Sequence, residues 1–273
     1  KDGVIADFEI TEIMLDYFIR KIHARNFFSR PRILICCPSN ITPVEKNAIK
    51  EAAERTGARR VFLEEEPKVA AIGAGMDISK PSGNMVIDIG GGTTDIAVLS
   101  LKDIVTSASI RVAGNVFDQD IIKFIKEKYK LLIGDKTAEE IKIEFANVYN
   151  PDKKKKMEVR GRDLTDGLPR NEKITSAQVE EAIKESISKI VDIVKSTLEK
   201  TPPELSSDIM EKGIVLAGGG ALIKNLDKLL SIETGMPVYI AEEPLDCVVR
   251  GTGKTLEDLE RLKSVLVNSR KRR

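Results

Sequence analysis

Two glycine runs with polar neighbours are the residues whose types and spacing could do chemistry. The first reads Asp88-Ile89-Gly90-Gly91-Gly92-Thr93-Thr94-Asp95 and the second Leu216-Ala217-Gly218-Gly219-Gly220-Ala221. Each run follows short β-branched apolar residues, which is typical of a buried strand. A strand that ends in glycines exposes backbone N–H groups with no side chain to block a close approach, and such groups suit a phosphate or a sugar edge. Two such turns predict a nucleotide held in a cleft between two related halves.

Asp88 lies where the first of these strands meets its glycine turn. A carboxylate at that point can hold a hydrated Mg²⁺ against phosphate, because Mg²⁺ keeps most of its waters. The alternative is a carboxylate that only caps the turn through backbone N–H bonds. The hydroxyls of Thr93 and Thr94 add donors at the same place and favour the metal role. We therefore expect Asp88 to contact Mg²⁺ through water.

Three consecutive glutamates, Glu64, Glu65 and Glu66, end another predicted strand directly before Pro67. A run of like charges is usually a solvated surface. Glu66, next to the proline, is also held where a carboxylate could orient an attacking water. The spacing alone leaves both interpretations open.

Glu139 and Lys142 stand three residues apart on a predicted helix and therefore share one face. The ordinary interpretation is an exposed ion pair that adds little stability. The second interpretation is a pair of side chains that face a nucleoside. Taken alone, the sequence favours the exposed pair.

The composition argues against several classes of function. Lys and Arg number 44 against 43 Asp and Glu, so no global positive field favours nucleic acid. Aromatic residues make up 4% of the chain and Trp is absent, which weakens base stacking as a binding mode. The single histidine and the three cysteines have no metal-ligand spacing, so metal clusters and Ser-His-Asp catalysis have little support.

The elements that must position these residues alternate between strand and helix, which predicts α/β lobes. Three successive strands at 85–89, 95–101 and 104–112 form a meander around the first glycine turn. Further strands are expected at 32–37, 60–63, 157–160, 172–175, 214–217 and 237–240. Helical patterns lie at 10–22, 43–56, 69–75, 116–129, 138–149, 177–198 and 221–230, with two more that begin at 244 and 253.

Local signals predict where three of these helices begin. Thr11 is placed to cap the first helix. Thr42 with Glu45, and Thr137 with Glu140, have the spacing of capping boxes for the helices that follow them.

Together these motifs resemble the actin, heat-shock chaperone and sugar-kinase superfamily. Asp88–Asp95 resembles its second phosphate motif, Gly218–Ala221 its adenosine motif, and Glu64–Ala71 its first connecting segment. A closer resemblance, over nearly the whole chain, is to the MreB/Mbl family of bacterial actin homologues. The stretches that carry it are 2–7, 65–67, 70–75, 137–144, 159–164 and 200–205.

The resemblance implies an α/β, actin-like ATPase fold with ribonuclease H-like duplicated lobes around a nucleotide cleft. It implies a partial lobe I at 1–80 plus 250–273, a large subdomain of lobe II at 81–116 plus 181–249, and a small subdomain of lobe II at 117–180. Glu66 would position the attacking water, Thr93 would lie near the terminal phosphate, and Asp88 would be the magnesium-side carboxylate. The implied nucleotide contacts are Gly90, Gly91, Gly92, Thr93, Thr94, Glu139, Glu140, Ile141, Lys142, Gly218, Gly219, Gly220, Ala221 and Leu222.

The resemblance also implies a function. Family members bind ATP and Mg²⁺, polymerise through longitudinal and lateral self-contacts, and guide lateral wall synthesis in rod-shaped bacteria. The implied location is the cytoplasm, at the inner face of the cell membrane, with inner-membrane morphogenesis proteins as partners and no nucleic acid. Two alternatives stay open: another ATPase of the superfamily, such as a chaperone or sugar kinase, and a polymerising scaffold with little hydrolysis.

The sequence departs from the family in three places. The family's first phosphate hairpin and the small subdomain after it, which carries most of the membrane contact, do not occur in the sequence, and its first residue is Lys1 rather than Met. We therefore expect a piece of a longer protein that hydrolyses ATP poorly. Lys68 stands where the family usually has an apolar residue, and Asp95 stands where it often has Glu.

Overall fold

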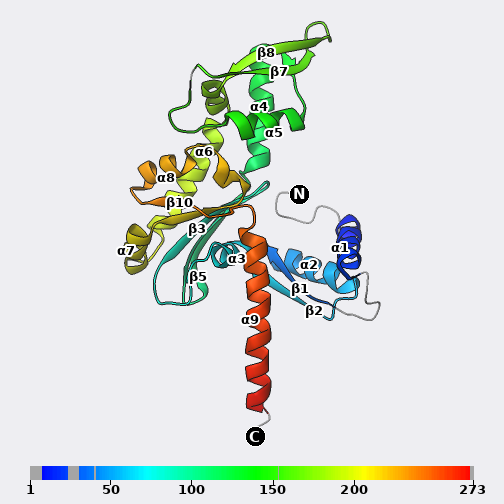
Figure 1. Cartoon of the computed structure of the whole chain (residues 1–273), viewed down its shortest axis with the longest axis vertical. Coiled ribbons are helices and arrows are strands. Elements are labelled where there is room, and N and C mark those ends of the chain that lie inside the picture. Colours follow the sequence, from blue (N-terminus) through cyan, green and yellow to red (C-terminus); the bar gives the residue numbers. More distant parts are fainter. Residues whose placement is uncertain (1–7, 24–30, 40, 153, 271–273) are drawn as a thin grey trace.

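The computed structural model describes residues 8–23, 31–39, 41–152 and 154–270. Their helices and strands form three sheets with helices packed around them (Figure 1). The two-stranded sheet pairs β1 (Arg32–Cys37) with β2 (Arg60–Glu65) in parallel, with α1 (Phe8–His23) and α2 (Pro43–Arg55) beside it. The predicted capping box of α2 is confirmed, because the Thr42 side chain accepts from the Glu45 backbone and the Thr42 N–H donates to the Glu45 carboxylate at 2.7 Å.

The central sheet has five strands in the order β10-β9-β3-β4-β5. Its strands are β3 (Asn84–Ile89), β4 (Thr94–Ser100), β5 (Asp103–Ile110), β9 (Ile214–Ala217) and β10 (Val238–Ile240). The predicted meander is confirmed, since β3, β4 and β5 pair antiparallel in succession. Strand β9 runs parallel to β3, with Ala217 opposite Asp88. Both glycine turns therefore leave the sheet at the same edge.

Strand β3 is buried along its whole length, which explains its continuous apolar run. Alternate side chains of a strand point to opposite faces of the sheet. Met85 and Ile87 join a core that also holds α4 (Gly114–Tyr129) and α6 (Ser176–Glu199). Val86 packs on the other face, in a core with α3 (Glu66–Gly73) and the start of α9 (Cys247–Arg270).

The third sheet is small and lies at the top of Figure 1. It has the order β6-β7-β8, formed by β6 (Leu131–Leu132), β7 (Lys156–Asp163) and β8 (Pro169–Thr175). Helices α4 and α5 (Asp135–Phe145) pack beside it, and α6 leads from it back to the central sheet. Helix α6 begins at a capping box formed by Thr175 and Gln178.

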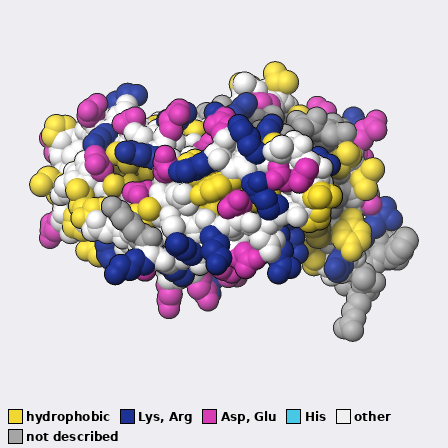
Figure 2. Space-filling model, turned by 90° about the horizontal axis from the view of Figure 1, so that it is seen from above, with side chains coloured by type: hydrophobic (Ala, Val, Ile, Leu, Met, Phe, Trp, Pro, Cys, Tyr) yellow, Lys and Arg dark blue, Asp and Glu magenta, His cyan; other side chains and the backbone are white. Residues whose placement is uncertain are grey.

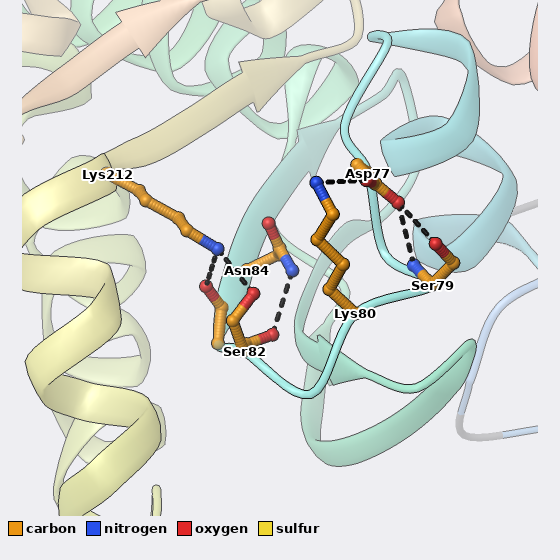
Figure 3. Close-up of polar contacts among 7 residues, drawn as sticks. Asp77, Ser79, Lys80, Ser82, Asn84 and Lys212 are labelled. Atoms are coloured by element: carbon orange, nitrogen blue, oxygen red, sulfur yellow. Dashed lines mark hydrogen bonds and ion pairs between the residues drawn. The ribbon is translucent and has the colours of Figure 1, made fainter.

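Helix α7 (Pro203–Lys212) and the segment before β3 meet at one end of the central sheet. Helices α7 and α8 (Leu226–Thr234) flank β9 in the chain. Figure 3 shows Lys212 reaching the segment before β3, where its ammonium donates to the Ser82 hydroxyl at 2.5 Å, while Asn84 donates to the Ser82 carbonyl at 2.9 Å. In the same segment Asp77 accepts from Ser79 and pairs with Lys80 at 3.0 Å (Figure 3). The Lys212 bond holds the start of β3 against α7, and the other bonds shape the segment before β3.

Helices α3 and α9 cross at very short range (Figure 1). A Cβ atom on Gly251 would lie 1.7 Å from the Val69 carbonyl oxygen, and one on Gly73 would lie 1.7 Å from the Cys247 carbonyl oxygen. Such distances leave no room for a side chain, so glycine is required on both helices where they meet. This crossing joins the chain after β2 to the chain after β10.

Several predicted elements differ from the structure. The first helix contains Thr11 inside it rather than at its cap, since α1 already includes Phe8. Helix α5 begins at Asp135 after Gly134, so the capping box predicted at Thr137 is wrong. The helix predicted at 221–230 is a 3₁₀ turn, Gly219–Leu222, followed by α8, and the two helices predicted from 244 and 253 are the single helix α9. Helix α7 and strand β6 were not predicted. The division into lobes stays a prediction.

Candidate nucleotide cleft

A cavity of about 730 Å³ lies where both glycine turns leave the central sheet. Its walls come from the turn after β3, the start of α4, one face of α5, the turn after β9 and the start of α9. The cavity thus gathers residues from segments far apart in the chain, and its size suits a small organic ligand. The residues that line it are Glu66, Asp88, Gly90, Gly91, Gly114, Asn115, Phe117, Glu139, Lys142, Ile143, Gly218, Gly219, Gly220, Leu222, Ile223, Pro244, Leu245 and Val248.

The first glycine turn opens into this cavity. A Cβ atom on Gly90 would meet only the Thr93 carbonyl oxygen at 3.5 Å, and one on Gly91 would meet the Asn115 side chain at 3.4 Å. Both are ordinary contacts, so packing does not require glycine at either position. The absence of side chains there keeps the backbone accessible, which is what close approach of a phosphate needs.

The second glycine turn has a different reason for its glycines. Gly218 has φ +79°, and its Cβ atom would lie 2.3 Å from the Ile89 carbonyl oxygen and 2.4 Å from an Asp88 carboxylate oxygen. A Cβ atom on Gly220 would lie 2.2 Å from the Ile89 side chain. Gly218 and Gly220 thus allow the turn to pack on the end of β3. They also place Gly219 and Leu222 at the cavity wall.

Two carboxylates on the acidic side of the cleft, those of Glu66 and Asp88, have the carboxylate of Asp95 as a neighbour behind the cavity wall. Asp88 and Asp95 stand opposite each other on β3 and β4. Burial, followed by the nearby charges of Glu66 and Asp95, raises the pKa of Asp88 to about 8. Burial, followed by the charge of Asp95, raises the pKa of Glu66 to about 6. A cluster that holds its protons this strongly lacks positive charge, so a bound cation would be favoured there.

The three consecutive glutamates have separate environments. Glu64 pairs with Lys68 at 3.2 Å, and Glu65 lies 3.9 Å from Lys46. Of the three, Glu66 is the one that lines the cavity. The run is therefore not one solvated surface, and the position of Glu66 agrees with the interpretation that assigns it to the cleft.

The donor groups around Asp88 decide how the expected Mg²⁺ could be held. Within the described part of the chain, no group of three or more His, Cys, Asp or Glu side chains could hold a metal ion. One oxygen of Asp88, Oδ2, is buried without a hydrogen-bond partner among these residues. Asp88 is thus one carboxylate with an unbonded oxygen beside the first glycine turn. Such a site fits a cation held through its waters better than a cation held directly by several protein ligands.

Lys142 does not form the exposed ion pair that its spacing from Glu139 suggested. Its ammonium donates to an Asp118 carboxylate oxygen at 2.8 Å and to the Gly114 carbonyl oxygen at 3.1 Å. The Lys142 and Asp118 side chains are 15% and 12% exposed, so the pair is mostly buried. Among the described residues that line the cavity, Lys142 is the only cation.

Several predicted site residues lie beside the cavity rather than on its wall. Thr94 is fully buried and its hydroxyl donates to the Val112 carbonyl at 2.7 Å, so it is not a free donor for a ligand. Thr93 bonds to Asp95. Ile141 and Ala221 are core residues. The predicted residues outside the lining are Gly92, Thr93, Thr94, Glu140, Ile141 and Ala221.

The sequence did not predict the contribution of α4 or the apolar wall. The N-terminus of α4 contacts the first glycine turn. The Gly114 N–H donates to the Gly90 carbonyl at 3.1 Å, and the Asn115 N–H donates to the Gly91 carbonyl at 2.8 Å. The sequence did contain a signal for this contribution, because α4 begins shortly after β5 ends and the N-terminus of a helix is a common binding site for anions. Ile143, Leu222 and Leu245 are exposed apolar side chains at the cavity and suit the flat face of a base.

Two glycine turns from parallel neighbouring strands face one cleft in this α/β fold, an arrangement that fits the class of actin-like proteins. The predicted fold class is confirmed. Residues 1–264 match the model of the MreB/Mbl protein family, so the chain belongs to the MreB/Mbl family.

Named relatives agree with this family. The chain is 60% identical to the cell shape-determining protein Mbl of Bacillus cereus, over 96% of this chain and 79% of that protein. It is 52% identical to the cell shape-determining protein MreB of Escherichia coli, over 95% of this chain and 75% of that protein.

Solved structures agree as well. This chain matches the crystal structure of MreB5 of Spiroplasma citri bound to AMPPNP with a TM-score of 0.91 and 42% sequence identity. The match covers 96% of this chain and 79% of the MreB5 chain. The MamK double helical filament, at 22% identity and a TM-score of 0.81 over 94% of this chain and 79% of that one, shares the fold. None of the helices in the described segments is long and apolar enough to cross a membrane.

Proposed function

We propose that the chain binds an adenine nucleotide with Mg²⁺ in this cleft and forms actin-like filaments that help set the shape of rod-shaped cells. The observation that carries the proposal is the cavity itself, in which both glycine turns, a carboxylate cluster and Lys142 meet. Membership of a family whose relatives are named cell shape-determining proteins supports the cellular role. The nucleotide is assigned by analogy with MreB5 of Spiroplasma citri, which binds AMPPNP and ADP.

Each residue of the cleft has a role in this proposal that follows from its chemistry. Gly91 offers its backbone N–H group to the phosphates, whereas the N–H of Gly90 is already bonded to the Thr93 carbonyl. The apolar wall at Leu222 and Leu245 holds the base. Asp88 would hold Mg²⁺ through water, and that ion supplies positive charge to offset the phosphates. Glu66 orients the water that attacks the terminal phosphate, because it is the glutamate of its run that lines the cavity.

Nucleotide binding would draw together the segments that line the cleft and so favour self-association, and hydrolysis would weaken the polymer. Filaments of this kind would organise lateral wall synthesis at the inner face of the membrane, together with membrane-bound morphogenesis proteins.

Sedimentation tests this proposal against the other classes of the superfamily. The chain is centrifuged at high speed with Mg²⁺ and ATP, with Mg²⁺ alone, and with ATP in excess EDTA. We expect pelleting that depends on both Mg²⁺ and nucleotide, whereas a sugar kinase or chaperone ATPase stays in the supernatant. A folded chain that stays in the supernatant under every condition would contradict filament formation. Phosphate release in the same samples separates an ATPase from a scaffold that only polymerises.

A further inference from the structure

The ammonium of Lys142 is held in place before any ligand is bound. A lysine ammonium has three donors. One bonds to Asp118 at 2.8 Å and a second to the Gly114 carbonyl at 3.1 Å. The described residues offer the ammonium no third partner, so one donor remains on a side chain that lines the cleft.

The contact with Gly114 connects the Lys142 ammonium to the first glycine turn. A Cβ atom on Gly114 would lie 3.4 Å from the Lys142 ammonium and 3.3 Å from the Gly90 carbonyl oxygen, so all three groups are close neighbours. The N–H of Gly114 in turn donates to Gly90 at 3.1 Å. Lys142 on α5 therefore touches the same glycine that ties α4 to the first glycine turn.

The charge of Lys142 matters because the rest of the cleft is acidic. Three carboxylates, those of Glu66, Asp88 and Glu139, line the cavity, and Lys142 is the sole cation among the lining residues that the structure describes. A nucleotide brings further negative charge. An ammonium displaced by an ångström or two would lose most of a short, directional hydrogen bond to that ligand.

Asp118 is the group that can prevent this displacement. It lies on the first turns of α4 with 12% of its side chain exposed, and one of its oxygens, Oδ1, is buried without a hydrogen-bond partner among the described residues. A buried carboxylate with an unsatisfied oxygen does not favour folding by itself. A carboxylate kept there at that cost suggests a role beyond stability.

We propose that Asp118 is a positioning residue of the nucleotide cleft: its carboxylate holds the Lys142 ammonium against Gly114, so that the remaining N–H of Lys142 donates to the bound nucleotide. The inference rests on the proposed function, because it assumes a nucleotide in the cleft. It adds a residue that acts through Lys142 and is itself absent from the cavity wall.

A double-mutant cycle on nucleotide affinity tests the proposal. Calorimetry measures the Kd for Mg²⁺ and AMPPNP with the unmodified chain, D118N, K142M and D118N/K142M, at a temperature where each is folded. Because a hydrogen bond to a charged group is lost, we expect D118N to weaken binding roughly tenfold. The double variant should bind like K142M within about twofold, since Asp118 acts only through Lys142.

The matched control is E181Q, which removes the carboxylate of an exposed pair with Lys128 at 3.3 Å, outside the cleft. It should leave the affinity unchanged. Equal affinity of D118N and the unmodified chain would overturn the proposal. So would additive losses in the double variant, because they would mean that Asp118 acts independently of Lys142.

Amine labelling provides a readout that needs no nucleotide. In the free chain, acetylation of Lys142 followed by mass spectrometry should be several times faster in D118N than in the unmodified chain, while Lys128 labels equally in both. Unchanged labelling of Lys142 would overturn the positioning role. A folded, unmodified chain that binds no nucleotide would instead overturn the proposed function, and the labelling result would still show whether Asp118 holds Lys142.

Discussion

Single residues on the acidic side of the cleft make the stability of the free chain depend on pH. The pKa of Asp88 is raised from 3.8 to about 8, first by burial. Between these two values the folded chain holds a proton that the unfolded chain has released. The stability contributed by Asp88 is therefore complete below about pH 4 and is lost as the pH rises toward 8.

Replacing Asp88 by Asn removes this loss. Without nucleotide or Mg²⁺, D88N should be more stable than the unmodified chain at pH 8 by at least about 1 kcal/mol, which raises the midpoint of thermal unfolding by about 2–4 °C. At pH 4 the two proteins should unfold at the same temperature. Thermal unfolding followed by circular dichroism at both values measures this, and a variant less stable than the parent at pH 8 would contradict the assigned burial.

Glu66 should matter for hydrolysis more than for binding. A carboxylate that orients water acts in the transition state, so its loss lowers the rate and leaves the ground-state affinity nearly unchanged. In a version of the protein that carries the family's first phosphate hairpin, we expect E66Q to bind ATP within about twofold of the unmodified protein and to release phosphate about 10²–10⁴ times more slowly. The control is E65Q, since Glu65 lies toward Lys46 and outside the cavity. Equal rates of phosphate release in E66Q and E65Q would move the water-positioning role to another residue.

Among the elements, the crossing of α3 and α9 depends most on sequence detail. A methyl group on Gly251 would overlap the Val69 carbonyl, and both partners of this contact are backbone in helices. G251A should therefore cost about 1–3 kcal/mol or more, seen as a lower unfolding temperature. Gly253 lies two residues along the same helix, where an added Cβ atom would meet nothing within 4 Å, so G253A should be neutral or slightly stabilising. Equal stabilities of the two variants would contradict the close crossing.

The elements that the sequence predicted well have strong local signals. The buried run of β3, the meander and the capping box of α2 depend on residues close together in the chain, and the structure confirms all three. The glycine turns also predicted a cleft, and the structure has a cavity where both turns leave the sheet; that a ligand binds there stays a prediction. The predictions that failed were helix starts with two competing signals, such as Gly134 against Thr137. Helix α7 was also missed, because Pro202 stands at its cap, Pro203 is its first residue and the rest of the helix is mostly polar.

The sequence could not reveal how distant segments meet. Nothing local to Asp118 indicates that it bonds a lysine 24 residues away. Gly218 and Gly220 line the cavity as the sequence predicted, but nothing in the sequence shows that glycine is also required there because both residues pack on the end of β3. Both facts arise from tertiary contact, and only the folded chain displays them.

At the scale of the whole molecule, the cleft is bounded by elements from three separate parts of the chain. The central sheet supplies both glycine turns, α4 and α5 supply the wall with Lys142, and the α3–α9 crossing supplies Glu66 and Val248. Seen from above, basic and acidic side chains intermingle over the surface (Figure 2), as expected from nearly balanced charges. A ligand in the cleft would contact all three parts, and under the proposed function this contact couples occupancy of the cleft to self-association.

The central claim is that this cleft binds an adenine nucleotide, and calorimetry with Mg²⁺ and ADP tests it most directly. Gly91 is not among the glycines with positive φ, and a Cβ atom there meets only ordinary contacts, so G91V should fold normally while filling the phosphate end of the cavity. The control is G253V, at an open position on α9. We predict one nucleotide per chain for the unmodified protein and G253V, and at least about a hundredfold weaker binding for G91V. Equal binding by folded G91V, or no binding by the folded unmodified chain, would contradict the account.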